Sequence, residues 1–238
     1  MEAPDWLVPL HAQLQERRDP WMLLEGQAMI EAALAGWWEV PGVIQAEDHP
    51  WEIPLWSGLE VQRLPQAELA ALGNPERHGG VIALAKQPQE TAEVGAYVKK
   101  VLAADALLVV CPRATDAAGA GELVRLAAGA GAAAVLFGVE GASPFEPDAV
   151  AASAGDVFKL PVKVADAGLI LRSLMAGKVH LVGLGGSDAA PIKAPEGRRA
   201  VVVPGQEGLD AFWKRVCDQL TSASLAVALE ALVVKEDK

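Results

Sequence analysis

Apolar runs of strand length recur along the second half of the chain, separated by segments in which apolar residues are spaced as on one face of a helix. The runs predict strands near residues 106–111, 133–137, 157–162, 179–182 and 200–203. The segments between them predict helices near residues 121–130, 165–176 and 221–234. Apolar strands that alternate with helices are typical of a parallel sheet covered on both faces, so this half predicts an α/β domain.

The first part of the chain, to about residue 86, has a different pattern, because proline-rich segments separate its few apolar runs. We expect a helix over 22–35 and a strand over 81–85. Polar residues at 86–93 predict a linker to the second part. This first part also holds six tryptophans, whose simplest role is to fill a core or a dimer contact, with base stacking as the alternative: Trp6, Trp21, Trp37, Trp38, Trp51 and Trp56.

Composition narrows the class of protein. The chain has 238 residues, 52% of them hydrophobic, which is enough for one large domain or two small ones. Its formal net charge of −11 counts against a nonspecific nucleic-acid binder, since such proteins are usually basic. No apolar stretch predicts a membrane span, and the first residues lack a signal-peptide pattern. The widely separated Cys111 and Cys217 predict neither a disulfide framework nor a zinc site, so we expect a cytoplasmic protein.

Common nucleotide-binding and hydrolytic motifs do not fit this sequence. Gly119 and Gly121 begin a dinucleotide-binding pattern, but Val124 stands where its third glycine belongs. The sequence has no P-loop, no G-x-S-x-G and no H-E-x-x-H. The four histidines are scattered, so we expect them to be structural or solvated. Neither a hydrolase triad nor a metal-dependent enzyme is supported.

Two other features carry candidate chemistry. Arg125 is a lone cation among the apolar residues of a predicted helix, and because an unpaired buried charge is costly it must reach solvent or point into a site. The strand near 200–203 ends in a glycine-flanked acidic loop, Gly205 to Gly208 with Glu207. Backbone amides freed by such glycines can hold a ligand at the carboxyl end of a parallel strand, although an ordinary strand-to-helix turn is the alternative.

Further segments match a known family in order and spacing. Asp116, Gly121 and Arg125 match the first family motif, D-P-x-N-x-G-x-x-x-R, with Ala117 for Pro and Gly119 for Asn. Taken together with the segments below, this pattern resembles the SpoU (TrmH-like) RNA 2′-O-ribose methyltransferases of the SPOUT class.

The same resemblance extends along the rest of the chain. Residues 153–162 match the pattern S-x-G-x-x-F-x-x-P-V, and residues 205–210 match the second motif, G-x-E-G-x-G, except for its last glycine. Residues 216–226 match the third motif, I-P-M-x-G-x-x-x-S-L-N, at Ser224 and Leu225. Residues 23–26 with the following helix, and residues 78–83, look like the N-terminal RNA-binding module of this family.

The resemblance implies a fold in two parts: a small L30e-like α/β domain over residues 1–90 that binds the RNA substrate, and a SPOUT methyltransferase domain over residues 97–238. The second domain would be a parallel-sheet α/β domain with a deep trefoil knot, which is rare among proteins. The resemblance also implies a homodimer with its sites at the subunit interface.

The resemblance further implies an activity, the transfer of a methyl group from S-adenosylmethionine to a ribose 2′-hydroxyl of rRNA or tRNA. The cofactor would lie against backbone at Gly205, Val216 and Leu225. Arg125 would act on the ribose hydroxyl and its neighbouring phosphate, with Glu207 and Ser224 helping to build the site. This agrees with elementary chemistry, because a ribose hydroxyl must lose its proton as it attacks the methyl group, and a local positive field lowers that barrier.

Two departures from the motifs leave other functions open. Gly119 and Ala226 stand where the family has asparagine side chains. A catalytically impaired relative that acts as an RNA- or protein-binding module is therefore the alternative to a working methyltransferase. A generic nucleotide-binding α/β protein is a third reading, but it does not explain the N-terminal match.

Overall fold

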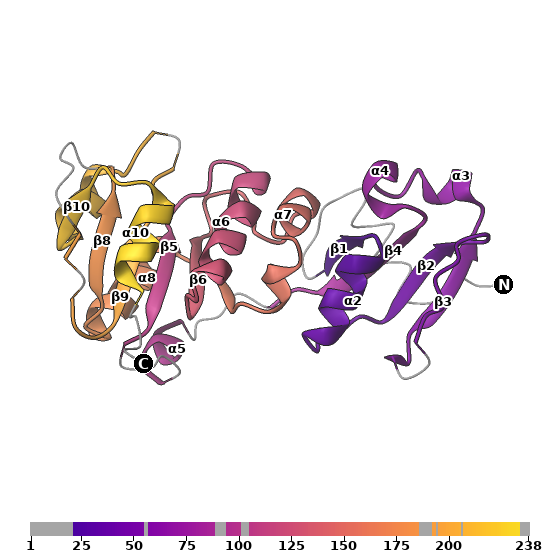
Figure 1. Cartoon of the computed structure of the whole chain (residues 1–238), viewed down its shortest axis with the longest axis horizontal. Helices are drawn as coiled ribbons and strands as arrows, with labels where there is room; N and C mark the ends of the chain where they lie inside the picture. The colour runs from indigo at the N-terminus through magenta and orange to yellow at the C-terminus, as the bar shows by residue number, and fades with distance from the viewer. Residues whose placement is uncertain are drawn as a thin grey trace.

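The chain forms two parts that lie side by side along the long axis of the molecule (Figure 1). The computed structural model describes residues 21–54, 57–88, 94–100, 105–185, 192–193, 195–205 and 207–233. Trp6, His11, Trp56, Gln206 and most of the expected linker lie outside these residues. No helix among them is long and apolar enough to span a membrane.

The N-terminal part is a mixed four-stranded sheet with helices on both faces. Its strands are β1 (Trp21–Glu25), β2 (Gly42–Ala46), β3 (Glu60–Leu64) and β4 (Val81–Lys86), in the order β1-β4-β2-β3. Only β2 and β3 are parallel. Helix α2 (Gln27–Ala35) packs on one face through Ile30 and Ala33, and α3 (Gln66–Leu69) packs on the other through Leu69. Helix α4 (Pro75–His78) precedes β4.

The C-terminal part is a six-stranded, fully parallel sheet covered on both faces. Its strand order is β10-β8-β9-β5-β6-β7, with bounds β5 (Leu107–Cys111), β6 (Ala134–Gly138), β7 (Val162–Ala165), β8 (His180–Leu184), β9 (Arg199–Val202) and β10 (Gln219–Thr221). Strands β5, β6 and β9 are buried throughout, which is why their sequences, apart from Arg199 at the start of β9, are continuously apolar rather than alternating.

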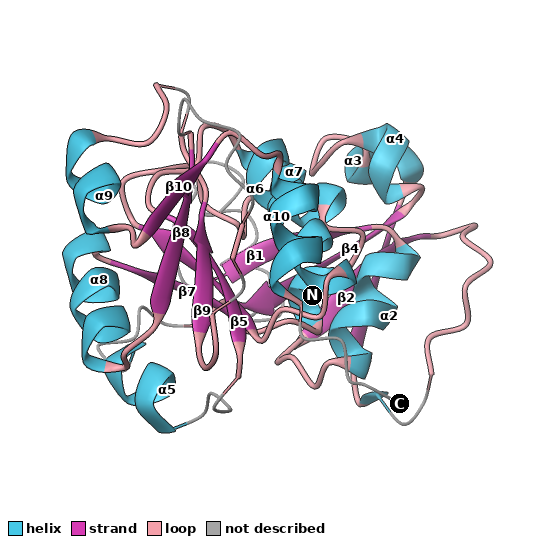
Figure 2. Ribbon diagram, turned by 60° about the vertical axis from the view of Figure 1, so that its left-hand side comes forward, coloured by secondary structure: helices cyan, strands magenta, loops and turns pink. Residues whose placement is uncertain are grey.

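Two layers of helices enclose this sheet (Figure 2). One face carries α6 (Ala117–Gly129), α7 (Pro147–Ala152) and α10 (Leu225–Leu232). The other face carries α5 (Val94–Lys100), α8 (Ala167–Ala176) and α9 (Ala211–Val216). The prediction of an α/β domain with a helix-covered parallel sheet is therefore confirmed.

Three element predictions are wrong in detail. Residues 22–25 belong to strand β1, because Gly26, with φ +90°, separates it from α2. The strand expected over 157–162 is a 3-10 turn at Asp156–Phe158, and β7 begins only at Val162, after Pro161. The helix expected over 221–234 is preceded by β10 and begins at Leu225, where Ser224 caps it by accepting a hydrogen bond from the Val227 amide.

The two parts share one continuous apolar core. Trp38, just after α2, packs edge-on against Phe158 with ring centroids 5.4 Å apart, and its indole N–H donates to the Phe158 carbonyl at 3.2 Å. Arg77 of α4 pairs with the buried Glu25 (Nε–Oε2 2.6 Å) and also with Asp148 of α7. Apolar packing and an ion-pair bridge therefore hold the N-terminal part against α7 and the turn that follows it.

Candidate functional site

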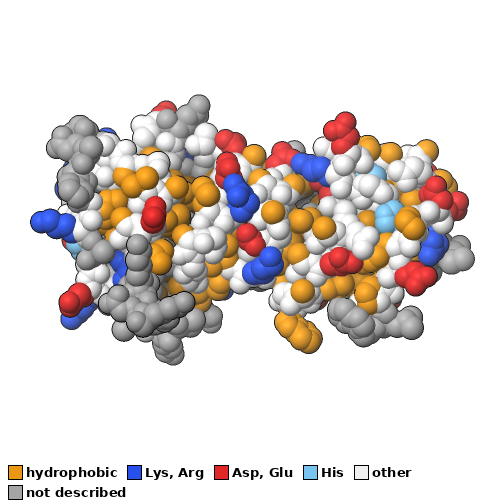
Figure 3. Space-filling model, in the orientation of Figure 1, with side chains coloured by type: hydrophobic (Ala, Val, Ile, Leu, Met, Phe, Trp, Pro, Cys, Tyr) orange, Lys and Arg blue, Asp and Glu red, His pale blue; other side chains and the backbone are white. Residues whose placement is uncertain are grey.

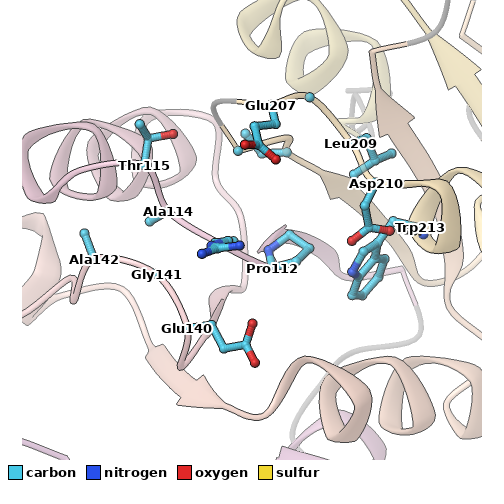
Figure 4. A pocket seen from close by; sticks show the side chains of 14 residues that line it. Pro112, Ala114, Thr115, Glu140, Gly141, Ala142, Glu207, Leu209, Asp210 and Trp213 are labelled. Atoms are coloured by element: carbon cyan, nitrogen blue, oxygen red, sulfur yellow. Dashed lines mark hydrogen bonds between the residues drawn. The ribbon is translucent and has the colours of Figure 1, made fainter.

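A pocket of about 450 Å³ opens at the carboxyl ends of β5, β6 and β9, where a parallel sheet commonly binds its ligands. Figure 4 shows the loops that surround it. Its walls come from the loops after these three strands and from α9: Pro112, Arg113, Ala114, Thr115, Glu140, Gly141, Ala142, Val203, Gly205, Glu207, Gly208, Leu209, Asp210 and Trp213.

Close backbone packing builds this pocket, and two glycines permit it. A Cβ atom on Gly205 would lie 2.8 Å from the Arg113 carbonyl oxygen, and one on Gly141 would lie 2.3 Å from the Ala114 nitrogen. Gly208 closes the tight turn by donating its N–H to the Gly205 carbonyl at 3.0 Å. Its φ of +86° is a conformation that side chains disfavour. The loop is therefore shaped by backbone rather than by side chains.

Charged groups around the pocket are mainly acidic. Glu140 comes from the loop after β6, whereas Glu207 and Asp210 come from the loop after β9 (Figure 4). Arg113 is the cation among the residues that line the pocket. Asp210 also caps α9 by accepting a hydrogen bond from the Trp213 amide at 2.9 Å, and the Trp213 side chain is buried. The pocket thus offers carboxylates to a cationic or donor-rich ligand, with one guanidinium beside them.

The loop after β9 and the segment before β10 converge on Gly183 of β8. A Cβ atom at Gly183 would lie 2.8 Å from each of three side-chain atoms, Cys217 Sγ, Leu209 Cδ2 and Leu220 Cδ2. Gly183 therefore lets the segments that carry the second and third motifs meet at one edge of the sheet.

The structure brings together only some of the predicted site residues. Gly205 and Glu207 line the pocket, but Arg125, Val216, Ser224 and Leu225 are not among its lining residues. Val216 ends α9 and packs against the core face that carries α8 and α9. Ser224 and Leu225 begin α10 on the opposite face, where the Ser224 hydroxyl is used as a helix cap.

Arg125 reaches solvent rather than the pocket of its own chain. Its side chain is 46% exposed and pairs with Glu122, one turn earlier on α6, at 3.1 Å. An apolar groove of about 360 Å³ runs alongside, between α6 and α10. Gly129, one turn after Arg125, lines this groove, as do Ala226 and Leu229 of α10. Arg125 therefore stands at the border of an exposed apolar surface.

Neither cysteine is suited to nucleophilic chemistry. Burial raises the pKa of Cys111 to about 11 and that of Cys217 to about 12, the latter with a smaller contribution from the Asp218 carboxylate. Both thiols are therefore protonated at neutral pH. Cys217 instead packs against β8, close to Gly183.

Sequence reasoning missed Arg113, Thr115, Glu140 and Trp213 as pocket residues. A signal was available for the first three, because they follow the predicted strands that end near 111 and 137, where ligand-binding loops occur in parallel sheets. No signal in the sequence placed Trp213, since its position depends on how α9 folds back over β8.

Comparison with known proteins gives a consistent picture. The 23S rRNA (guanosine(2553)-2'-O)-methyltransferase RlmP of Bacillus subtilis (strain 168) is 25% identical over 244 residues, which cover 98% of this chain and 94% of the relative. No protein-family model matches the chain.

Solved structures match the fold over nearly the whole chain. The SpoU methyltransferase AviRb from Streptomyces viridochromogenes, crystallised with AdoMet, superposes with a TM-score of 0.78 at 20% identity, covering 97% of both chains. An RNA 2'-O ribose methyltransferase superposes with a TM-score of 0.73 at 26% identity, covering 97% of this chain and 93% of the other. The resemblance that the motifs indicate is therefore confirmed, and the chain is similar to the SpoU methyltransferases in both sequence and fold.

Proposed function

We propose that this protein is an S-adenosylmethionine-dependent RNA methyltransferase that modifies a ribose 2′-hydroxyl of rRNA or tRNA. The observation that carries the proposal is the similarity to SpoU methyltransferases, which extends through both parts of the chain. The loop from Gly205 to Gly208 supports it, because the second motif lies at the ligand-binding edge of the sheet.

The chain's own residues suit this chemistry. S-adenosylmethionine supplies an electrophilic methyl group on a sulfonium cation, and the carboxylates of Glu140, Glu207 and Asp210 give this region a negative potential that favours a cation. Arg125 would supply positive charge and a planar fork that fits a phosphate, and it would stabilise the ribose oxygen while an O–CH3 bond forms, the S–CH3 bond breaks and the hydroxyl proton passes to solvent. Glu207 and Ser224 complete the proposed site as acceptor groups.

Calorimetry with S-adenosylmethionine, followed by transfer of a labelled methyl group to total RNA of the host, tests the function. We expect binding of the cofactor and incorporation of label at ribose. A protein that binds the cofactor and transfers no methyl group to any RNA would falsify the enzymatic reading.

The cofactor site is proposed to include backbone of Gly205, Val216 and Leu225. We expect Gly205→Val to weaken S-adenosylmethionine binding more than about tenfold, roughly 1.4 kcal/mol. The added side chain would meet the Arg113 carbonyl as well as the ligand, so the loop itself must move. Calorimetry measures the loss, and thermal unfolding without ligand measures the cost to the loop. If the affinity for S-adenosylmethionine is unchanged, the cofactor does not bind at this loop.

We also propose that residues 1–90 form an L30e-like RNA-binding domain and that residues 97–238 form a SPOUT domain. The SPOUT domain would contain a trefoil knot through which the C-terminal helix passes. The path of the C-terminal segment supports the knot. It leaves β10 at one edge of the sheet, and α10 then packs near β9, where the Leu232 carbonyl accepts a hydrogen bond from Arg199.

The protein is further proposed to be a homodimer through the α6–α10 surface, which we define as the groove between α6 and α10 with its apolar rim. Figure 3 shows hydrophobic side chains gathered over α10. Val227, in the first turn of this apolar helix and next to Ala226 of the groove, is 54% exposed. Exposed patches of this kind mark subunit contacts, and Arg125 at the border of the groove would then lie at the interface.

A charge on this surface should therefore prevent dimerisation. We expect Val227→Glu to convert a dimer to a monomer at micromolar concentration while the subunit stays folded, because the introduced carboxylate would be desolvated in the contact. Sedimentation velocity measures the change. Val61→Glu, which charges an exposed valine of the N-terminal part, is the matched control and should leave the dimer intact.

A non-catalytic RNA- or protein-binding module is the second candidate function. Two observations favour it. Gly119 and Ala226 stand where the family motifs have asparagine, and the Arg125 side chain is already paired with Glu122. The methyl-transfer assay separates the two candidates directly.

A further inference from the structure

The pocket at the carboxyl ends of β5, β6 and β9 holds charges of both signs that do not pair with one another. Arg113 lines it, and this exposed guanidinium makes no hydrogen bond or ion pair with any residue that the structure describes. The same is true of the exposed carboxylates of Glu140 and Glu207, which flank the pocket in Figure 4. The free guanidinium and carboxylates are therefore available to a ligand.

Close backbone packing holds Arg113 and Glu140 on neighbouring loops. A Cβ atom on Gly141 would lie 2.3 Å from the Ala114 nitrogen and 3.0 Å from the Arg113 carbonyl carbon, so the loops after β5 and β6 touch. The loop after β9 also lies against Arg113, because a Cβ atom on Gly205 would lie 2.8 Å from its carbonyl oxygen. Binding groups placed on such a fixed backbone lose little conformational entropy when a ligand binds.

The charges of the pocket complement those of S-adenosylmethionine. This cofactor carries a sulfonium cation and, at its amino-acid end, an ammonium and a carboxylate. It is thus a net cation with one anionic group, and the pocket offers the opposite set, carboxylates with one guanidinium. A phosphate of RNA fits less well, because Glu140, Glu207 and Asp210 would all oppose it.

We propose that Arg113 binds the carboxylate at the amino-acid end of S-adenosylmethionine and that Glu140 accepts a hydrogen bond from its ammonium. A guanidinium fits a carboxylate with two parallel hydrogen bonds, and a carboxylate forms a charge-assisted hydrogen bond with an ammonium. The adenosine end is then left to the backbone of Val216 and Leu225, which do not line this pocket. The inference rests on the proposed function, because it names side chains that hold the cofactor of that reaction.

The test compares S-adenosylhomocysteine with 5′-methylthioadenosine by calorimetry on the full chain. Both ligands have an adenosine and a thioether sulfur, but only the first has the amino-acid end. We expect the wild type to bind S-adenosylhomocysteine at least about tenfold more tightly. Arg113→Met should weaken S-adenosylhomocysteine at least about tenfold and leave 5′-methylthioadenosine within about twofold, so that the preference disappears. Glu140→Gln should reduce the same preference several-fold, because the amide keeps an acceptor but loses the charge.

Binding of 5′-methylthioadenosine is the internal control for folding, since a distorted pocket would lose both ligands. Arg172→Met is the matched control: it replaces an exposed arginine of α8 that does not line the pocket, and both affinities should stay as in the wild type. Arg113→Lys should keep only part of the preference, because an ammonium attracts the carboxylate without the planar fork.

Equal binding of the two ligands by the wild type would overturn the inference, as would an equal loss of both in Arg113→Met. Unchanged affinities in Arg113→Met together with a raised KM for RNA would also overturn it, because the guanidinium would then contact the RNA instead.

Methyl transfer to RNA separates the failure of this inference from the failure of the proposed function. A protein that transfers methyl groups but shows no preference for the amino-acid end retains the proposed function and refutes the role of Arg113. A protein that shows the preference, loses it in Arg113→Met and transfers no methyl group retains the role of Arg113 and refutes the proposed function.

Discussion

Replacement of Arg125 by alanine should lower methyl transfer by at least a hundredfold, about 2.7 kcal/mol of transition-state stabilisation, while S-adenosylmethionine affinity stays within a few-fold. Arg125 is the cation at the motif position for the ribose contact, and it lies exposed on α6, where an RNA ligand can reach it. Single-turnover transfer and calorimetry on the same preparations measure the two effects.

Two further variants decide what Arg125 contributes. Glu122→Ala removes its ion-pair partner, and because an exposed pair is worth only about 0.2–1 kcal/mol, we expect transfer within a few-fold of wild type. Arg125→Lys should not restore transfer, since a point charge lacks the planar fork that binds a phosphate with two parallel hydrogen bonds. Arg172→Ala, which removes an exposed arginine from α8 on the other face of the sheet, is the matched surface control.

Full activity in Arg125→Ala would exclude this residue from the chemistry. The next residue to replace would then be Arg113, which lines the same pocket as Glu207. This outcome would also remove one reason for placing the site at a subunit interface, because Arg125 borders the α6–α10 surface and does not line the pocket of its own chain.

The regular part of the fold could be predicted from the sequence because burial on both faces leaves a simple signal. Strands β5 and β6 are apolar throughout, and β9 is apolar after its first residue, Arg199. The sequence predicted each of these strands within one or two residues. The N-terminal strands were harder. β3 lies at a sheet edge with much of its surface exposed, so its sequence, Glu60–Leu64, shows no long apolar run.

Some motif positions proved to be structural rather than chemical. Asp116 caps α6 by accepting the Gly119 amide at 2.7 Å. Ser153 is fully buried and donates to the Val150 carbonyl, and Phe158 packs against Trp38 in the shared core. Matching a motif therefore located the right segments, but it did not separate residues that hold the loops from residues that face a ligand.

The candidate site could be predicted only in part, for a physical reason. Gly205 and Glu207 lie within one short loop, so the motif alone identifies them. Arg113 and Asp210 meet there because two loops, distant in sequence, pack backbone against backbone, and such packing leaves no periodic signal.

The second large effect that we expect is a loss of stability when Gly121, in the first motif, is replaced by alanine. A Cβ atom there would lie 2.0 Å from the Ala149 carbonyl oxygen and 2.9 Å from its Cα, so α6 and α7 must separate to accept alanine. The carbonyl cannot turn aside easily, since it accepts the amide of the fully buried Ser153 at 2.9 Å.

We expect Gly121→Ala to lower the free energy of unfolding by about 3–5 kcal/mol and the midpoint of thermal unfolding by about 10 °C. Gly129→Ala is the matched control on the same helix, because its Cβ would meet nothing within 4 Å in its own chain. Since Gly129 lines the α6–α10 groove, both substitutions are compared in the monomeric Val227→Glu variant. Its higher helix propensity should leave stability unchanged or raise it by about 0.5–1 kcal/mol. Urea unfolding of both variants measures the difference. A loss below about 1 kcal/mol in Gly121→Ala would mean that α6 and α7 do not approach each other this closely, and the motif glycine would then need a role in ligand binding instead.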